Sequence, residues 1–424
     1  MIRALAVWWD GACVGRLEID AHGDLSFAYD PDWLADPSRP AVSFSLPKRP
    51  EHFGRREARP FFAGLLPEEG QREAVARALG VSKSNDFRLL ERLGGDVAGA
   101  PTLWPEGEPP PASQGLTATE PLDDASLLHV LDELPKRPFL AGEDGLRLSL
   151  AGAQQKLPVV LVNGRIALPA PGQPSTHILK PPISWLPGTT ANEALAMRLA
   201  AALDLPTAPV EPRRTEGRPY LLIERYDRTV GADGAIHRLH QEDFCQALGI
   251  PPEHKYAAEG GPNFPACFEL VRRACAQPAP AVLRLLDAAI FTVIVGNADA
   301  HGKNFSLLYG PRGVKLAPLY DLLCTVAYPE VQAKFAMKIG KRAMLEEFKP
   351  TTWEDFGRDV GVGPAFVRRR AGELAELTLT RIGATAEGIA AAGLDDAELE
   401  GFVDLISGRA QTVLDLARAK LRPG

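Results

Sequence analysis

Alternating apolar and polar positions mark the start of the chain as a sheet. Strand-like runs are expected over residues 4–9, 12–19 and 25–29. They are separated by Asp10-Gly11 and His22-Gly23-Asp24, which are strong signals for short turns because aspartate and glycine tolerate the backbone angles that tight turns require. The pattern therefore predicts that the chain begins with a β-meander.

The later pattern changes from strands to helices along the chain. Apolar residues three and four apart predict helices over 60–80 and 84–93, and proline and glycine make 105–115 a linker. A helix over 124–133 and a strand-rich stretch over 146–225 follow, with one helix inside it at 190–203. Helices are then expected over 268–274, 280–295, 353–360 and 364–377, with two more before the C-terminus and a β-hairpin made by 305–309 and 314–316.

This order of elements predicts an α+β fold with two lobes. We divide the chain into an N-terminal subdomain (1–105), the remainder of the N-terminal lobe (106–250) and a helical C-terminal lobe (251–424). A ligand is expected in the cleft between the lobes, where concave surfaces of this kind usually lie.

Composition narrows the class of protein. The 424 residues are 45% hydrophobic and 24% charged, as is ordinary for a globular protein. The net charge of −7 argues against a surface built throughout to hold nucleic acid but does not exclude a local basic patch. The five cysteines lack Cys-x-x-Cys spacing, which indicates reduced thiols. We find neither a signal peptide nor an apolar run of about 18 residues, so a cytoplasmic protein without a membrane span is expected.

The stretch from Val295 to Asp321 carries the most chemical information. An apolar helix is expected to end at Gly296, and a polar loop with Asp299 and Asn304 leads into the predicted hairpin, after which Asp321 appears. A hairpin returns the chain to its starting point, so these three oxygen-bearing side chains can converge there. Such ligands suit Mg²⁺, and the spacing Asp-x-x-x-x-Asn is that of the catalytic loop of phosphoryl-transfer enzymes. The spacing alone is a weak signal, because Asp and Asn are common in loops.

Two upstream segments supply possible phosphate contacts. The small residues between Arg147 and Lys156 would let backbone N–H groups approach a phosphate, although a tight β-turn explains them equally well and a Walker A motif is absent. Lys180 ends a predicted strand and Glu193 lies on the next helix. A lysine on a strand can reach phosphates, but alone it could equally be a surface residue that closes the strand.

Together these segments resemble the HipA family of serine/threonine kinases. The resemblance is carried in order by SLAGAQQK, ILKPP, NEALAMRLA, IERYDR, QEDFCQALG, KYAAEGGPNF, NADAHGKNFSLL, LAPLYDLL and AMKIG, and before them by FFAGLLPEEGQRE and LGGDVAGAPTLWP. It spans essentially the whole chain. It implies a protein-kinase-like fold that uses ATP and Mg²⁺.

The resemblance also implies a role for particular residues. Asp299 would be the catalytic base, Asn304 and Asp321 the magnesium ligands, and Ser149 an autophosphorylated serine. Nucleotide contacts would come from Ala151, Gly152, Ala153, Gln154, Gln155 and Lys156 in the phosphate loop, from Lys180, from Glu224, Arg225 and Tyr226 beside adenine, and from His301, Gly302, Lys303, Asn304, Tyr320, Asp321, Leu322 and Leu323. Conventional protein kinases carry His-Arg before the aspartate and Asp-Phe-Gly downstream, so their switching is not expected here.

Partners follow from the same resemblance. Family members of this kind phosphorylate an aminoacyl-tRNA synthetase, glutamyl-tRNA synthetase being the best-known type, and are restrained by a small helix-turn-helix antitoxin, HipB, which brings them to operator DNA. Arg368, Arg369 and Arg370 would touch DNA phosphates at a helix end, although a solvated run of charges explains them as well. Two other classes stay open: a small-molecule kinase of the aminoglycoside type, and a corepressor that acts mainly by binding its antitoxin.

Overall fold

The computed structural model describes residues 3–111, 119–143, 146–231, 234–394 and 397–420. Its N-terminal part is a four-stranded antiparallel sheet in the order β3-β2-β1-β4, with short helices packed beside it. The elements are β1 (Arg3–Trp9), β2 (Ala12–Ile19), β3 (Leu25–Tyr29), α1 (Pro31–Ala35), α2 (Arg55–Ala63), α3 (Glu69–Ala78), α4 (Asp86–Leu93) and β4 (Thr102–Pro105). The predicted meander is confirmed, because Leu5, Val7 and Trp9 alternate inward as a half-buried strand requires.

The helix predicted over 60–80 is wrong in one respect, since the chain breaks between α2 and α3. Pro67 lies in the break, where it lacks an N–H and pushes Leu66 away from helical angles. The break turns Glu68 inward, and only 8% of this residue is exposed.

A five-stranded antiparallel sheet occupies the middle of the molecule, in the order β6-β5-β7-β9-β8. Its elements and their neighbours are α5 (Asp124–Glu133), β5 (Leu157–Val162), β6 (Arg165–Ala167), β7 (His177–Lys180), α6 (Thr189–Ala202), β8 (Val210–Thr215), β9 (Arg218–Glu224) and the separate hairpin β10 (Arg228–Val230) and β11 (Ile236–Arg238). Helix α6 is rich in alanine and buried, which lets it pack closely against β8 and β9. The linker predicted over 105–115 lies outside the described residues from position 112 on.

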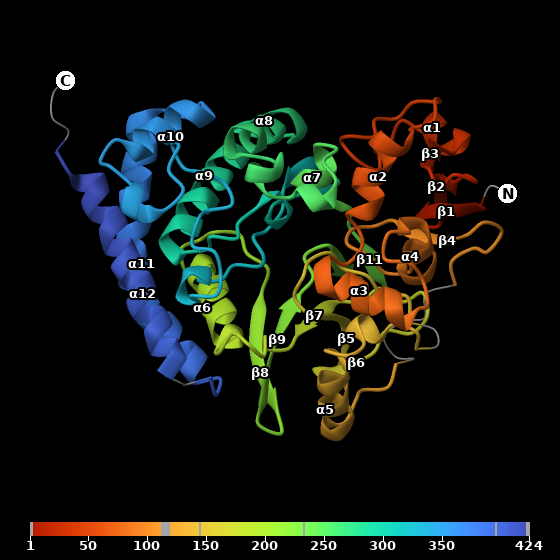
Figure 1. Ribbon diagram of the computed structural model, residues 1–424, viewed down its shortest axis with the longest axis horizontal. Coiled ribbons are helices and arrows are strands. Elements are labelled where there is room, and N and C mark those ends of the chain that lie inside the picture. Colours follow the sequence, from red (N-terminus) through yellow and green to blue (C-terminus); the bar gives the residue numbers. More distant parts are fainter. Residues whose placement is uncertain (1–2, 112–118, 144–145, 232–233, 395–396, 421–424) are drawn as a thin grey trace.

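Helices dominate the rest of the chain. They are α7 (Phe244–Ala247), α8 (Phe264–Ala274), α9 (Pro278–Val295), α10 (Thr352–Val360), α11 (Pro364–Ala390) and α12 (Ala397–Arg418), with a small sheet of β12 (Gln241–Asp243), β13 (Ser306–Gly310) and β14 (Gly313–Leu316). Figure 1 shows α11 and α12 side by side at one end of the long axis and the N-terminal sheet at the other. The mixed helix and sheet class is as predicted, while the domain boundaries at 105 and 250 stay predictions.

The sequence misjudged the last helices of this part. Helix α11 continues to Ala390, and one helix, α12, follows it in the described residues where two were expected. Helix α9 is long and apolar enough to cross a membrane by length and composition alone. It carries Arg284 and Asp287, and 67% of it is buried inside the protein, as is usual for the core helix of a globular lobe.

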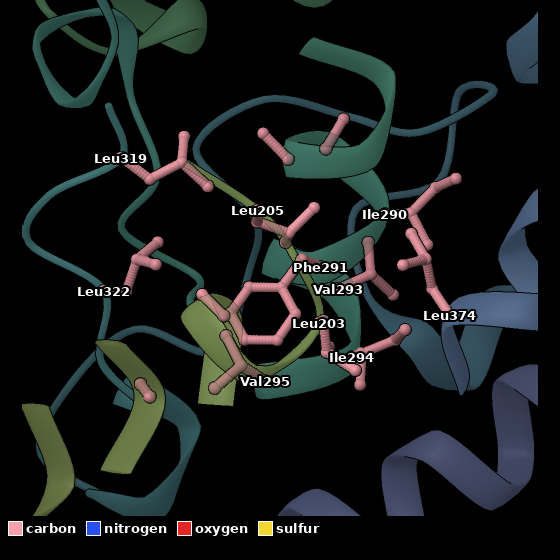
Figure 2. Packing of buried hydrophobic residues seen from close by; sticks show 14 of the residues in the cluster. Leu203, Leu205, Ile290, Phe291, Val293, Ile294, Val295, Leu319, Leu322 and Leu374 are labelled. Atoms are coloured by element: carbon pink, nitrogen blue, oxygen red, sulfur yellow. The ribbon is translucent and has the colours of Figure 1, made fainter. Parts of the chain in front are cut away.

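Helix α9 is the centre of the larger of two hydrophobic clusters. Figure 2 shows Phe291 among Leu203 and Leu205 after α6 and Leu319 and Leu322 beyond the hairpin. Leu319 and Leu322 flank Asp321, so this packing fixes the backbone from which that carboxylate projects. Removing a buried phenylalanine such as Phe291 would cost about 3–5 kcal/mol.

Candidate active site

The hairpin β13–β14 brings Asn304 and Asp321 together. A one-turn 3₁₀ helix, Gly302–Asn304, precedes β13, and Asp321 follows β14. Asn304 Nδ2 donates to Asp321 Oδ2 at 3.1 Å, and Asn297 Nδ2 lies 3.4 Å from the Asp321 carbonyl. Asp321 has a φ of 58°, a left-handed conformation that an aspartate adopts only where its surroundings hold it. Of the three side chains expected to converge at one end of the hairpin, Asn304 and Asp321 are thus in contact.

Lys180 joins this pair from the end of β7. Its Nζ donates to Asp321 Oδ1 at 2.7 Å and to Glu193 Oε1 on α6 at 2.6 Å. Burial alone would lower the pKa of Lys180, but the two carboxylates raise it above its usual value, so the amine stays charged. The same lysine lowers the pKa of Asp321 against the opposing effect of burial. A lysine on a strand is thus placed between a helix carboxylate and a loop carboxylate.

Helix α6 is tied to the segment that follows Asp321. The side chain of Asn192 accepts from the N–H of Cys324 at 2.7 Å and donates to its carbonyl at 3.1 Å. Both groups are buried, so these bonds would be costly to lose. The position of Glu193 is therefore coupled to that of Asp321 through the backbone as well as through Lys180.

Asp299 lies in the loop between α9 and the 3₁₀ turn, and its side chain is exposed to solvent. Its backbone N–H donates to Asn297 Oδ1 at 3.2 Å, and its Oδ1 accepts from the hydroxyl of Tyr256 at 2.9 Å. The protein around the carboxylate desolvates it in part and, with help from Asp321, raises the pKa of Asp299 to about 6. Such a group is ionised near neutrality and basic enough to accept a proton.

The loop over 151–156 folds beside these side chains. Lys156 is buried, and its Nζ donates to the Ala151 carbonyl at 2.6 Å. Burial and the charge of Lys180 lower the pKa of Lys156 to about 8, and a phosphate placed beside it would favour its charged form. Gly152 has a φ of 107°, which strains any other residue, and a Cβ there would lie 2.6 Å from Lys156 Nζ and displace this amine.

The N-terminal subdomain reaches into this region through α3 and the residue before it. Glu68 N–H donates to the Gly152 carbonyl at 3.3 Å, and its carboxylate accepts from Lys255 Nζ at 2.9 Å. Lys303 Nζ lies 3.5 Å from the other carboxylate oxygen and donates to Asp243 at 2.6 Å. Against the opposing effect of burial, the two lysines lower the pKa of Glu68 to about 2. Sequence reasoning missed this cluster, because nothing in the local pattern links position 68 to 255.

Several predicted nucleotide contacts have side chains that the fold already uses. Lys303 is buried in the ion pairs just described, and Tyr320 donates to the Lys303 carbonyl at 2.6 Å. His301 accepts from the Lys303 N–H at 3.3 Å through Nδ1, and burial lowers its pKa to about 3, so the ring is neutral. Leu322 belongs to the core. A nucleotide would therefore meet these positions mainly through their backbone.

The segment predicted to meet adenine contains a second buried cluster of charges. Arg225 Nε donates to Asp227 Oδ1 at 2.9 Å, and its guanidinium lies 3.3 Å from Asp96 of the N-terminal subdomain. Arg228 is 2.9 Å from the same Asp96 carboxylate. Tyr226 packs against Tyr320 with ring centroids 5.9 Å apart, while Glu224 is exposed. The Arg225 side chain is thus used in ion pairs within the protein.

Ser149 is fully buried, and its Oγ donates to the carbonyl of Leu65 at 2.7 Å. It follows Leu148, which bridges to Asp96, and it precedes the loop over 151–156. The hydroxyl therefore faces the N-terminal subdomain in this conformation and not the groups around Asp321. Any reaction at this oxygen requires the segment to move outward first.

The three arginines predicted to touch DNA lie in the second turn of α11, not at the end of a helix. Arg370 forms two bonds to Asp287, at 2.8 and 3.0 Å, and Arg368 donates to the carbonyl of Ala417 at 2.9 Å. Arg369 is the exposed member, with 67% of its side chain open to solvent. Arg368 and Arg369 also line a cavity of about 360 Å³ beside the end of α12.

Three comparisons place the chain among known proteins. Residues 5–103 match the model of the HipA N-terminal domain, and residues 148–382 match that of the HipA-like C-terminal domain. The Y4mE protein of Sinorhizobium fredii is 58% identical over 97% of this chain and 99% of its own length. The serine/threonine-protein kinase toxin HipA of Shewanella oneidensis is 30% identical over 80% of this chain and 78% of its own. The chain belongs to the HipA family.

A solved structure of this family supports the fold. The Shewanella oneidensis HipA, crystallised with HipB and its operator DNA, superposes with a TM-score of 0.81 at 26% sequence identity, covering 97% of this chain and 96% of that one. The two-lobed, kinase-like architecture expected from the sequence is therefore confirmed. The HipA resemblance drawn from short motifs is confirmed as well.

Proposed function

We propose that this chain is a kinase that uses Mg-ATP to phosphorylate a serine or threonine hydroxyl of a protein. The observation that carries the proposal is the constellation of Lys180, Asn304 and Asp321 beside the exposed carboxylate of Asp299. Lys180 would bind phosphate oxygens, and Asp299 would accept the proton of the attacking hydroxyl. Membership of the HipA family supports both assignments.

The residues present fit a magnesium ion. Within the described ranges no group of three or more His, Cys, Asp or Glu side chains gathers at one point, so a cage made of protein alone is not expected. Magnesium usually takes one or two protein oxygens and completes its shell with phosphates and water. Asp321 and the amide oxygen of Asn304 would supply the protein oxygens, and the bound ion would neutralise charge on the transferring phosphate.

The targets and partners are inferred from the family. An aminoacyl-tRNA synthetase, of the glutamyl type in the first instance, would be the protein substrate, and its modification would stop translation and growth. A HipB-like antitoxin would bind this chain and carry it to operator DNA, which fits the complex in which the Shewanella relative was crystallised. Of the three arginines, Arg369 is the one exposed for a phosphate contact. Five free thiols fit a cytoplasmic location.

The proposed function is tested by replacing the base without disturbing nucleotide binding. Asp299→Asn keeps the shape of an exposed side chain, so the protein should fold and bind Mg-ATP within a few-fold of the unaltered chain in calorimetry. Transfer of ³²P from [γ-³²P]ATP to protein should fall by about 10²–10⁴-fold, the usual contribution of a general base. Asp359→Asn, which changes an exposed aspartate on α10, serves as the matched control. Transfer at the unaltered rate by Asp299→Asn would contradict the assignment.

A further inference from the structure

Tyr256 is the residue that engages the proposed base. Its hydroxyl donates to Asp299 Oδ1 at 2.9 Å. Burial and the nearby Asp299 raise the pKa of Tyr256, so the phenol keeps its proton and acts only as a donor. One carboxylate oxygen is thereby fixed, while the exposed side chain of Asp299 can still present the other oxygen to a hydroxyl.

The ring of Tyr256 is held in place by two neighbours. It meets the His301 ring edge-on, with centroids 5.2 Å apart and planes at 80°. Lys255 Nζ lies 5.3 Å from the centroid of the Tyr256 ring. His301 is itself fixed as the cap of the turn that carries Asn304. The tyrosine is thus built into the same framework as the proposed metal ligand.

Lys255 connects this tyrosine to the N-terminal subdomain. Its Nζ donates to Glu68 at 2.9 Å and to Glu69 at 3.1 Å, and Lys255 is 7% exposed. The N–H of Glu68 also binds the carbonyl of Gly152 in the loop over 151–156. Glu68 of the N-terminal subdomain therefore contacts both the loop on the phosphate side of the site and Lys255, the neighbour of Tyr256.

We propose that Tyr256 is a positioning residue for Asp299 and that Glu68 holds it in place through Lys255. This inference rests on the proposed function, because it takes Asp299 as the base. Tyr256 keeps its proton throughout, and the proton of the acceptor hydroxyl passes to the free oxygen of Asp299. The N-terminal subdomain is, on this account, part of the catalytic apparatus and not only a surface for partners.

The first test uses the full chain with Tyr256→Phe. Loss of one hydrogen bond to a charged carboxylate should lower kcat for ³²P transfer and for ADP release from Mg-ATP roughly tenfold. The KM for ATP should stay within about twofold, since Tyr256 is not proposed to touch the nucleotide. Tyr309→Phe, which removes a hydroxyl bonded to Glu242 instead, should leave kcat unchanged.

A double-mutant cycle separates positioning from general damage. In the Asp299→Asn background, Tyr256→Phe should change the residual rate little, because the group through which it acts is already neutral. An equal fall in both backgrounds, or a rate for Tyr256→Phe that matches or exceeds that of the unaltered chain, would overturn the proposal. A rise would indicate that the phenol blocks the place of the acceptor. If Asp299→Asn alone is fully active, the proposed function itself fails.

The second test addresses the link to the N-terminal subdomain. Glu68→Gln should lower kcat severalfold with the KM for ATP little changed, and Tyr256→Phe should add little to it. Glu253→Gln is the matched control, because Glu253 also pairs across the same boundary but with Arg59. Equal kcat values for the two glutamine variants would remove Glu68 from the proposal. Urea denaturation of each variant shows whether a loss of activity is caused by unfolding. If Glu68→Gln loses activity in that way, the double-mutant cycle of Tyr256 and Asp299 decides the proposal.

Discussion

A charge placed at Ser149 should release the loop over 151–156 and weaken nucleotide binding. Ser149 is fully buried and bonded to the Leu65 carbonyl at 2.7 Å. Ser149→Ala loses that bond and leaves a buried carbonyl unpaired, at a cost of about 1–3 kcal/mol. Ser149→Asp adds a negative charge that faces the same carbonyl, and an uncompensated buried charge costs about 3–5 kcal/mol. Outward movement of the segment would relieve this cost.

Three measurements follow from these magnitudes. If the segment stays in place, urea denaturation should show Ser149→Asp less stable than Ser149→Ala by about 2 kcal/mol. If the segment moves outward, a protease should cleave the chain near residues 146–156. Outward movement would remove Gly152 from Glu68 and displace Lys156, so calorimetry should show weaker binding of Mg-ATP. Ser82→Asp, at an exposed serine, controls for the added charge alone. Stability and ATP affinity equal to those of Ser149→Ala would refute the reasoning, and with it self-inactivation by phosphorylation.

Two further predictions concern buried groups. Burial raises the pKa of Glu242 from 4.5 to about 7, so the contribution of this residue to stability is complete below pH 4.5 and falls as the pH rises to 7. Relative to Glu242→Gln, the unaltered chain should lose about 3 kcal/mol of unfolding free energy over this window in urea denaturation. Parallel curves of unfolding free energy against pH for the two proteins would contradict this prediction. Gly152→Ala should cost about 1–2 kcal/mol of unfolding free energy in urea denaturation, because the φ of 107° at this position strains any other residue. It should also weaken Mg-ATP binding in calorimetry, because the new methyl group displaces the amine of Lys156. Gly164→Ala, at a φ of 77° with open space around it, is the control that should show the strain alone.

The parts of the site that sequence could predict are those set by local structure. Asn304 and Asp321 flank a hairpin whose turn and strand pattern are visible in the chain, and a hairpin necessarily brings its ends together. Lys180 ends a strand that the apolar pattern also marks. Because each of these positions depends on a few neighbouring residues, the convergence was predictable before any coordinates.

The contacts that sequence missed join distant parts of the chain. Glu68, which follows Pro67 in the break between α2 and α3, meets Lys255 across 187 positions of sequence, and Asp96 meets Arg225 across 129 positions. No periodicity records such pairs. The pairing of Arg370 was not visible for a related reason, since a run of arginines looks alike whether it faces solvent or Asp287.

The buried charges around Asp96 have a consequence for how the polypeptide could be divided. Only 3% of Arg225 and 7% of Arg228 are exposed, and both residues form ion pairs with Asp96, which lies in the N-terminal subdomain. A chain cut after residue 105 would leave those guanidinium groups without that counter-ion, and the fragment that bears Lys180 and Asp299 would need the other fragment as an obligate subunit. What is now an internal contact would become the interface of a heterodimer.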